Sequence, residues 1–232
     1  MYSLSVAKIN QLRMCGNRGL RLSAQEEEIL AQIRDGSAED DPVAFVQGHY
    51  ITRTITPSKP VRLLEMRNAL STKFRTAVLP MEAEDGSHTC VLFVGSASAA
   101  TLGKNAVEVA LATATKLNCN TCIIVSDRGY SFDASKAVSE SHLLVDFFLM
   151  SSLQFNLPDH KMVPRHERCT EEEKRALYLE AGTSALRLPI LSTVDPVAIY
   201  YGWRSGTLVR ITRDYSLLDM PAATSISYRI VI

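Results

Sequence analysis

The first residues of the chain alternate apolar and polar positions with the period of an α-helix. Leu4, Ala7, Ile9 and Leu12 recur at roughly helical spacing, and the glycine-containing run 16–19 then ends the pattern. The sequence therefore predicts an opening helix over residues 3–15.

A second helix is predicted from about residue 23 to residue 35. Ser23 and Glu26 have the spacing of a capping box, in which the hydroxyl and the carboxylate each accept a hydrogen bond from a helix-end amide. Apolar residues follow at helical spacing as far as Ile33. The acidic run 35–42 is interpreted as a solvated loop.

From residue 43 the pattern changes to the alternating, β-branched segments that are typical of strands. Strands are predicted over residues 44–47, 50–55, 75–79 and 88–95. Residues 103–117 then have a helical pattern, and Thr121–Ser126 is a short apolar strand. This strand–helix–strand order implies a parallel strand pair, so the first domain is expected to be α/β.

A domain boundary is predicted at residue 155, because Pro158 closely follows an apolar run and cannot continue a helix. The two predicted domains are residues 1–155 and residues 156–232. The second contains a mixture of short helices and strands, so it is expected to be a small α+β domain.

Three elements of the second domain have clear local signals. Thr170 and Glu173 form a second capping box, before a helix over 174–181. Asp195 and Pro196 are an N-cap and first-turn signature of a helix that ends at Gly202.

Two strands complete this domain. One is predicted over 207–213, where Gly206 turns the chain. The other is the last segment, in which Ile226, Tyr228, Ile230 and Ile232 alternate with Ser225, Ser227 and Arg229. That alternation predicts one buried face and one wetter face.

Composition limits the class of protein. The chain has 232 residues, of which 46% are hydrophobic and 22% charged, as in an ordinary globular protein. Lys and Arg number 25, as do Asp and Glu, so the whole chain lacks the positive field expected of a protein that holds nucleic acid alone. The five cysteines and the absence of a signal-peptide pattern predict a reducing compartment, and no apolar run is long enough to span a membrane.

Cysteine and histidine residues suggest metal or redox chemistry at two places. Cys119 and Cys122 have CxxC spacing, but they lead into an apolar strand rather than a helix, so we interpret them as packing residues. A zinc site would need His88 and Cys90 to complete it. The second place is one loop, where His160, His166 and Cys169 could bind a metal but no fourth ligand is evident. We therefore predict no cofactor and no metal.

A third set of residues allows a catalytic interpretation. Asp127, Asp133 and Lys136 could belong to a metal-dependent nuclease, but the carboxylates needed on a neighbouring strand are not apparent. The alternative functions are such a nuclease or a free-standing DNA-binding transcription factor.

The C-terminal part of the sequence carries a recognisable pattern. It runs from the His160–His166 block (HKMVPRH) through the capped helix, Leu188-Pro189 and the Asp195–Gly202 block (DPVAIYYG) to Gly206 and the terminal Tyr228-Arg229. The order and spacing of these blocks resemble common subunit five of the eukaryotic nuclear RNA polymerases, and also its archaeal counterpart, which consists of this domain alone. The first domain is similar to the family more weakly, in its opening helix, its Arg18-Gly19 turn and the strand at Thr121.

The resemblance implies a non-catalytic structural subunit of a DNA-directed RNA polymerase, located in the nucleus, or in the nucleolus if it serves polymerase I. The second domain would be an assembly domain that docks on the largest subunit among the other polymerase subunits. The residues implied to make that contact are His160, Val163, Pro164, His166, Asp195, Pro196, Tyr200, Gly202, Gly206 and Arg229.

The first domain would be a jaw with a nuclease-like but inactive fold beside downstream DNA. Arg128, Ser131 and Lys136 would lie near that DNA. The family usually has Thr-Pro-Ser-Ala where this chain has Ser131-Phe132-Asp133-Ala134, and Ile190 stands where the family has an arginine. These departures predict a divergent or class-specific copy of the subunit, although which polymerase it serves does not follow from the sequence.

Overall fold

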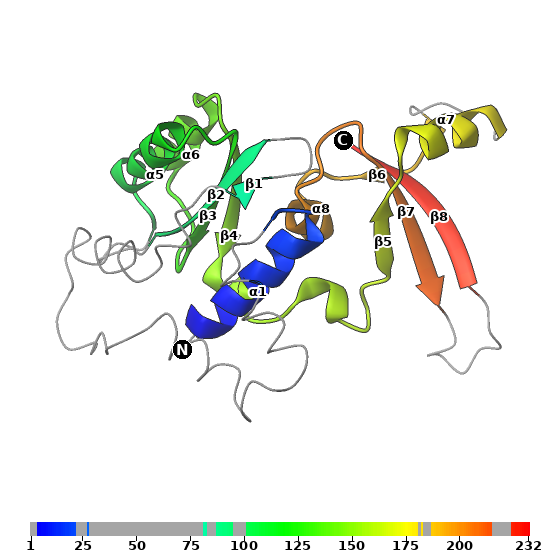
Figure 1. Ribbon diagram of the computed structural model, residues 1–232, viewed down its shortest axis with the longest axis horizontal. Coiled ribbons are helices and arrows are strands. Elements are labelled where there is room, and N and C mark those ends of the chain that lie inside the picture. Colours follow the sequence, from blue (N-terminus) through cyan, green and yellow to red (C-terminus); the bar gives the residue numbers. More distant parts are fainter. Residues whose placement is uncertain are drawn as a thin grey trace. The chain divides into compact units, whose positions relative to one another are not determined.

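A computed structural model describes residues 4–21, 27, 81–82, 87–94, 101–180, 182, 187–214 and 224–232 (Figure 1). The chain divides into two compact units, Met1–Phe155 and Asn156–Ile232. The helix predicted over 23–35 and the strands predicted between 44 and 79 lie outside the described residues. Within the described residues, no helix is long and apolar enough to cross a membrane.

The first unit contains a four-stranded sheet in the order β1-β2-β3-β4. Its strands are β1 (Met81–Glu82), β2 (His88–Val94), β3 (Thr121–Ser126) and β4 (Leu144–Leu149). Strands β2, β3 and β4 run parallel, and β1 pairs antiparallel with β2. Helix α5 (Lys104–Lys116) connects β2 to β3, and α6 (Phe132–Ser139) connects β3 to β4. The predicted strand–helix–strand unit is therefore confirmed.

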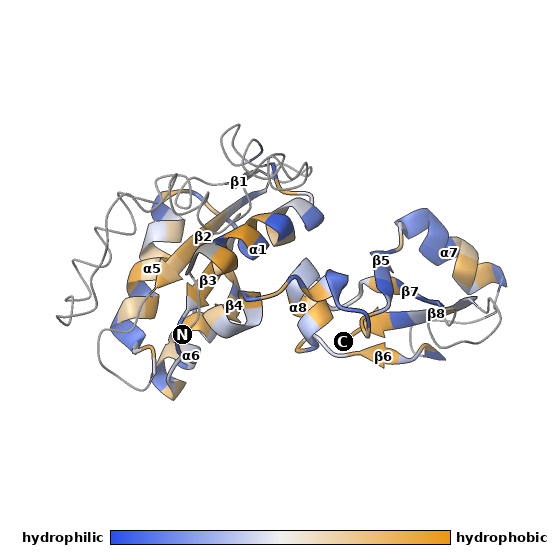
Figure 2. Ribbon diagram, turned by 90° about the horizontal axis from the view of Figure 1, so that it is seen from below, coloured by the Kyte–Doolittle hydropathy of each residue, from blue (hydrophilic) through white to orange (hydrophobic). Residues whose placement is uncertain are grey.

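The core of this unit forms between α5 and the sheet. Small apolar residues of α5, including Ala110 and Ala114, let the helix approach Cys90 of β2 and Ile124 of β3 closely. Figure 2 shows β2 and β3 largely in the colour of hydrophobic residues. Because strands of a parallel sheet are covered on their faces, such near-continuous apolar runs are expected of them.

Helix α1 (Leu4–Asn17) carries polar side chains into this unit. Lys8 is fully buried and donates a hydrogen bond to Gln11 Oε1 at 2.7 Å. Asn10 Nδ2 donates to the carbonyl of Leu153, in the 3-10 helix η2 (Met150–Leu153), at 2.9 Å. Each buried polar group named here thus has a partner, which buried polar groups require.

An ion pair connects the end of α1 to strand β4. Arg18 Nη1 lies 2.7 Å from Asp146 Oδ2, and the two side chains are only 7% and 4% exposed. The guanidinium also lies over the ring of Phe148, 5.7 Å from its centroid. The pair joins residues that are 128 positions apart in the sequence.

The second unit contains a sheet in the order β5-β7-β8-β6. Its strands are β5 (Arg165–Arg168), β6 (Ile190–Leu191), β7 (Leu208–Asp214) and β8 (Thr224–Val231). Its helices are η3 (Leu157–Asp159), α7 (Glu171–Glu180) and α8 (Pro196–Tyr201). Strand β7 pairs antiparallel with β5 and β8, whereas β6 runs parallel to β8. The expectation of an α+β second domain matches this arrangement.

Apolar residues are buried on both faces of this sheet. One cluster joins Val209 and Val231 to Ala198 of α8, and the other joins Leu208 and Ile230 to Leu177 of α7. Since neighbouring residues of a strand point to opposite faces, β7 and β8 contribute to both clusters.

The predicted alternation along the last strand is wrong in its detail. Val231 is fully buried although it falls on the face predicted to be wetter, whereas Ile226 and Ile232 are exposed by 58% and 53%. The physical reason is that both faces of the sheet are covered near Ile230. Burial therefore depends more on how far along the strand a residue lies than on which face its side chain points to.

We expect a fragment of residues 156–232 to fold by itself, because the second unit has its own sheet and both hydrophobic clusters are internal to it. A well-dispersed amide NMR spectrum of the isolated fragment is the expected result. If the spectrum of this fragment is collapsed, and a fragment extended toward residue 143 gives a dispersed one, the domain boundary lies elsewhere.

Candidate functional site

A cavity in the second unit lies beside the block that carries the family resemblance. Its volume is about 240 Å³. Its walls come from η3 (Leu157 and Pro158), from the segment Val163–His166 that leads into β5, and from α8 (Val197 and Tyr201). The structure thus brings three of the predicted docking residues, Val163, Pro164 and His166, to one concave surface.

Helix α8 forms one wall because both of its ends are fixed locally. Asp195 Oδ1 accepts a hydrogen bond from the amide of Val197 at 2.8 Å, Pro196 occupies the first turn, and Gly202 ends the helix with φ +68°. Left-handed backbone of this kind favours glycine. The sequence-based prediction of this helix is confirmed, and Asp195, Pro196 and Gly202 hold the wall of the cavity without lining it.

Tyr200 lies behind the cavity. Its side chain is buried, and its hydroxyl donates to Asn156 Oδ1 at 2.6 Å, which ties α8 to the residue where the second unit begins. The following residue, Tyr201, lines the cavity and stacks on Trp203 with ring centroids 4.6 Å apart. Sequence reasoning chose Tyr200 and missed Tyr201, because a short helix gives no periodic signal to say which of two adjacent tyrosines lines the cavity.

The other predicted docking residues lie away from the cavity lining. His160 is exposed, and its Nδ1 accepts a hydrogen bond from the amide of Met162 at 3.2 Å. Gly206 has φ +89°, and its carbonyl accepts from Lys174 Nζ at 3.0 Å. Arg229 donates to the carbonyl of Ile190 at 3.0 Å. These three residues stabilise turns and strand ends.

His166 is the titratable group of the cavity. Its Nδ1 lies 2.6 Å from the carbonyl oxygen of Pro164, which can only accept, so Nδ1 carries the proton and Nε2 is an acceptor in the neutral ring. Burial lowers the pKa of His166 below its ordinary value, against the opposing effects of the Pro164 carbonyl and the charge of Asp195, while Arg213 and Arg229 lower it further. The neutral imidazole is therefore the form that fits this cavity.

We expect the stability of the second unit to fall as the pH decreases through the ordinary histidine range. Because the pKa of His166 is lower in the folded chain than in the unfolded chain, the unfolded chain binds more protons there, and stability rises with pH. Urea unfolding between pH 5 and pH 8 measures this. A His166→Gln variant is the control, since it should lose this part of the pH dependence and keep the part due to carboxylates.

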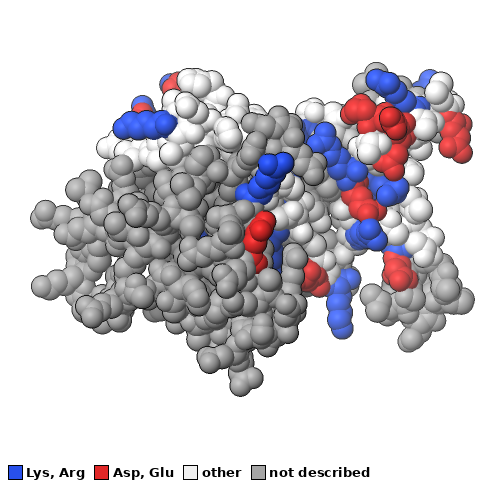
Figure 3. Space-filling model, in the orientation of Figure 1, with Lys and Arg blue, Asp and Glu red and all other residues white. Residues whose placement is uncertain are grey.

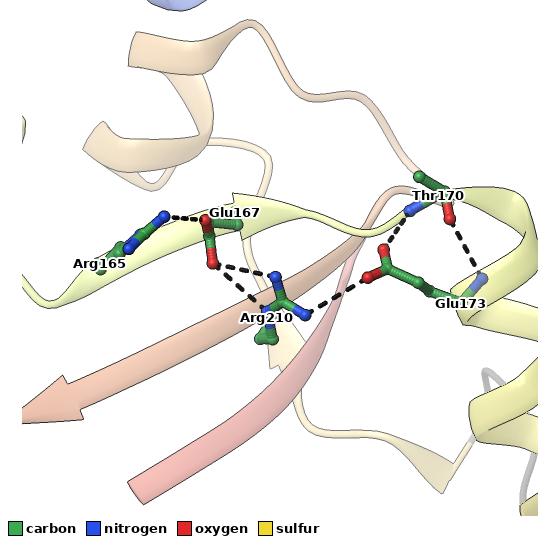
Figure 4. A network of polar contacts seen from close by, with 5 residues as sticks. All are labelled: Arg165, Glu167, Thr170, Glu173 and Arg210. Atoms are coloured by element: carbon green, nitrogen blue, oxygen red, sulfur yellow. Dashed lines mark hydrogen bonds and ion pairs between the residues drawn. The ribbon is translucent and has the colours of Figure 1, made fainter. Parts of the chain in front are cut away.

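A network of charged residues covers the face of strand β5 that lies opposite His166. Arg210 of β7 donates to Glu167 of β5 at 3.1 Å and to Glu173 of α7 at 3.4 Å, and Arg165 donates to Glu167 at 2.6 Å (Figure 4). Glu173 also closes the predicted capping box with Thr170, at 2.8 and 3.2 Å. Glu173 at the start of α7 is therefore a structural residue, as the capping-box pattern indicated.

The three residues predicted to lie near DNA follow strand β3 in one segment of the first unit. Arg128 is paired with Asp127 at 3.8 Å and Lys136 with Glu140 at 3.9 Å, while Ser131 caps α6 by accepting from the amide of Ala134 at 3.3 Å. Positive and negative side chains are also mixed over the second unit on the face shown in Figure 3. As far as the described residues go, neither surface is a strong phosphate-binding patch by charge alone.

The cysteines have the environment of packing residues. All five are buried thiols. A hydrogen bond with Cys122, burial and the charge of Cys122 all raise the pKa of the Cys90 thiol, and burial raises the pKa of Cys119 to about 12. Among the described residues, no three His, Cys, Asp or Glu side chains are placed to hold a metal ion.

Comparison with known proteins identifies the second unit. A family model described as RNA polymerase Rpb5, C-terminal domain, matches residues 155–231. Subunit Rpo5 of the DNA-directed RNA polymerase of Archaeoglobus fulgidus is 35% identical over 80 residues, which are 34% of this chain and all of that protein. The chain belongs to the Rpb5 family of RNA polymerase subunits.

Eukaryotic relatives match a longer part of the chain at lower identity. Subunit RPABC1 of the DNA-directed RNA polymerases I, II and III of Caenorhabditis elegans is 29% identical over 143 residues, 61% of this chain and 66% of that protein. Subunit 5B of the DNA-directed RNA polymerases IV and V of Arabidopsis thaliana is 28% identical over 114 residues, 49% of this chain and 50% of that protein. The chain thus spans about half to two thirds of the length of these relatives.

Proposed function

We propose that this chain is a non-catalytic structural subunit of a nuclear DNA-directed RNA polymerase. The observation that carries the proposal is the match of the second unit to the whole length of an archaeal polymerase subunit. A unit that exists alone as a polymerase subunit contains what assembly requires. The first unit is then an addition of the kind found in the longer eukaryotic relatives.

The second unit docks on the largest polymerase subunit. Support comes from the geometry of the segment Val163–His166, where a proline restrains the backbone and the side chains form one wall of the cavity. A loop that is already restrained loses little conformational entropy when a partner binds to it.

The first unit forms a jaw with a nuclease-like fold near downstream DNA. Its contribution to DNA contact is weak, because the two basic side chains that follow β3 are each offset by a neighbouring carboxylate. A jaw of this kind is placed beside DNA by the protein contacts of the second unit rather than by its own charge.

Affinity purification of the tagged, full-length chain from its own cells tests the proposal. The largest subunit of one nuclear polymerase is expected in stoichiometric amounts, and its identity reveals which polymerase class contains this copy. Recovery of the chain free of every polymerase subunit, or plasmid nicking by the pure chain with a divalent cation, would refute the proposal.

A further inference from the structure

In the part of the chain that the structure describes, strand β5 is an edge of its sheet, with β7 on one side and no strand on the other. Its register with β7 continues to Cys169, whose amide donates to the carbonyl of Leu208 at 2.9 Å. Since pairs alternate between bonded and non-bonded along an antiparallel ladder, Glu167 and Arg165 bond to β7, whereas the backbone groups of His166 and Arg168 point outward. Among the described residues, no backbone group pairs with these outward positions.

The cavity described above begins at the start of this open edge. His166 lies in β5 and also lines the cavity, together with Val163 and Tyr201. Its volume of about 240 Å³ is below the range of about 300–1,000 Å³ that is usual for small-molecule sites. It therefore has the size for one bulky side chain rather than a cofactor.

Cations flank the same segment. Lys161 precedes the cavity wall and Arg168 ends β5, and both side chains are exposed. No ion pair of either is found with the described residues. By contrast, Arg165 between them is already paired with Glu167. The ends of the segment are thus complementary to acidic side chains of a partner.

We propose that an extended segment of a partner protein adds a strand to the open side of β5 and inserts one bulky apolar side chain, flanked by acidic residues, into the cavity. Main-chain hydrogen bonds to His166 and Arg168 then supply affinity, and the cavity supplies specificity. The inference rests on the proposed function, because the segment belongs to the largest polymerase subunit.

The probe is a set of short overlapping peptides that tile the largest polymerase subunit of the same organism. The full-length chain is expected to bind a peptide that has a bulky apolar residue with acidic neighbours, and not its scrambled form. Binding of scrambled and native peptides alike, or of none, would overturn the inference.

Two variant pairs separate the backbone contact from the cavity contact. Arg168→Pro removes an outward amide without touching the ladder to β7, and should weaken peptide binding by about tenfold or more, whereas Arg168→Ala keeps that amide and loses only the charge. Val163→Phe fills the cavity and should abolish binding, whereas Met162→Phe adds the same side chain at a position that is 82% exposed. Thermal unfolding shows whether each variant is folded.

The outcome in cells distinguishes this inference from the proposed function. If the wild-type chain and folded Arg168→Pro both recover the largest subunit equally, the strand addition is wrong and the polymerase assignment stands. If the wild-type chain recovers no polymerase, the proposed function itself fails. Dimerisation of the pure chain that Arg168→Pro abolishes would make a second copy the occupant and would overturn the inference.

Discussion

Replacing Asp146 by alanine is expected to lower the free energy of unfolding of the first unit by about 3–5 kcal/mol. The change leaves the Arg18 guanidinium, which is only 7% exposed, without the carboxylate that lies 2.7 Å away. A buried cation that loses this carboxylate loses the Coulomb attraction to it and keeps the cost of desolvation. Removing the carboxylate of a solvent-exposed ion pair would change the free energy of unfolding very little.

Urea-induced unfolding of the full-length chain measures this effect. The first control is Glu108→Ala, which removes a pair with Lys104 whose side chains are about half exposed, and should cost less than about 0.5 kcal/mol. The second is the double variant Arg18→Met with Asp146→Val, which replaces both charges by apolar groups and should recover much of the loss. A single variant as stable as the wild type would mean that the pair is open to water.

Replacing Val163 and Pro164 together by glycine is expected to release the chain from the polymerase. Pro164 fixes its own φ and restrains Val163 to extended backbone, so the wild-type segment is already ordered before docking. Freeing two residues adds about 2–4 kcal/mol of ordering cost. That corresponds to binding weaker by about 30- to 1,000-fold.

Co-purification of the largest subunit with each tagged variant is the measurement. The matched controls are Arg128→Ala and Lys136→Ala in the first unit, which should spare incorporation and at most weaken DNA contact in a salt-dependent way. Thermal unfolding must show that the glycine variant is folded. If the glycine variant co-purifies normally and the control variants do not, assembly belongs to the first unit instead.

Local features of the second unit could be predicted from the sequence because their causes are local. The capping box of Thr170 and Glu173, the cap of Asp195 and the glycine that ends α8 each depend on residues a few positions apart. Such hydrogen bonds form between residues a few positions apart and do not depend on distant packing, so the sequence patterns that predict them are reliable.

Features that depend on distant residues could not be predicted. The cavity needs Leu157, Val163 and Tyr201 to meet from three separate elements, and the Arg18–Asp146 pair joins residues 128 positions apart. Neither the composition of a sequence nor the spacing of its residues predicts which side chains tertiary packing will bring together. The two-sided burial of Val231 and Ile230 escaped prediction for the same reason.

The burial of the five thiols has a practical consequence. Four of them, Cys15, Cys90, Cys119 and Cys122, belong to the first unit, and Cys169 is the one cysteine of the second. A thiol-specific reagent added in short pulses therefore modifies a cysteine only when the surrounding structure opens. The chain thus contains its own reporters of opening, and mass spectrometry can assign each opening event to one unit without any introduced label.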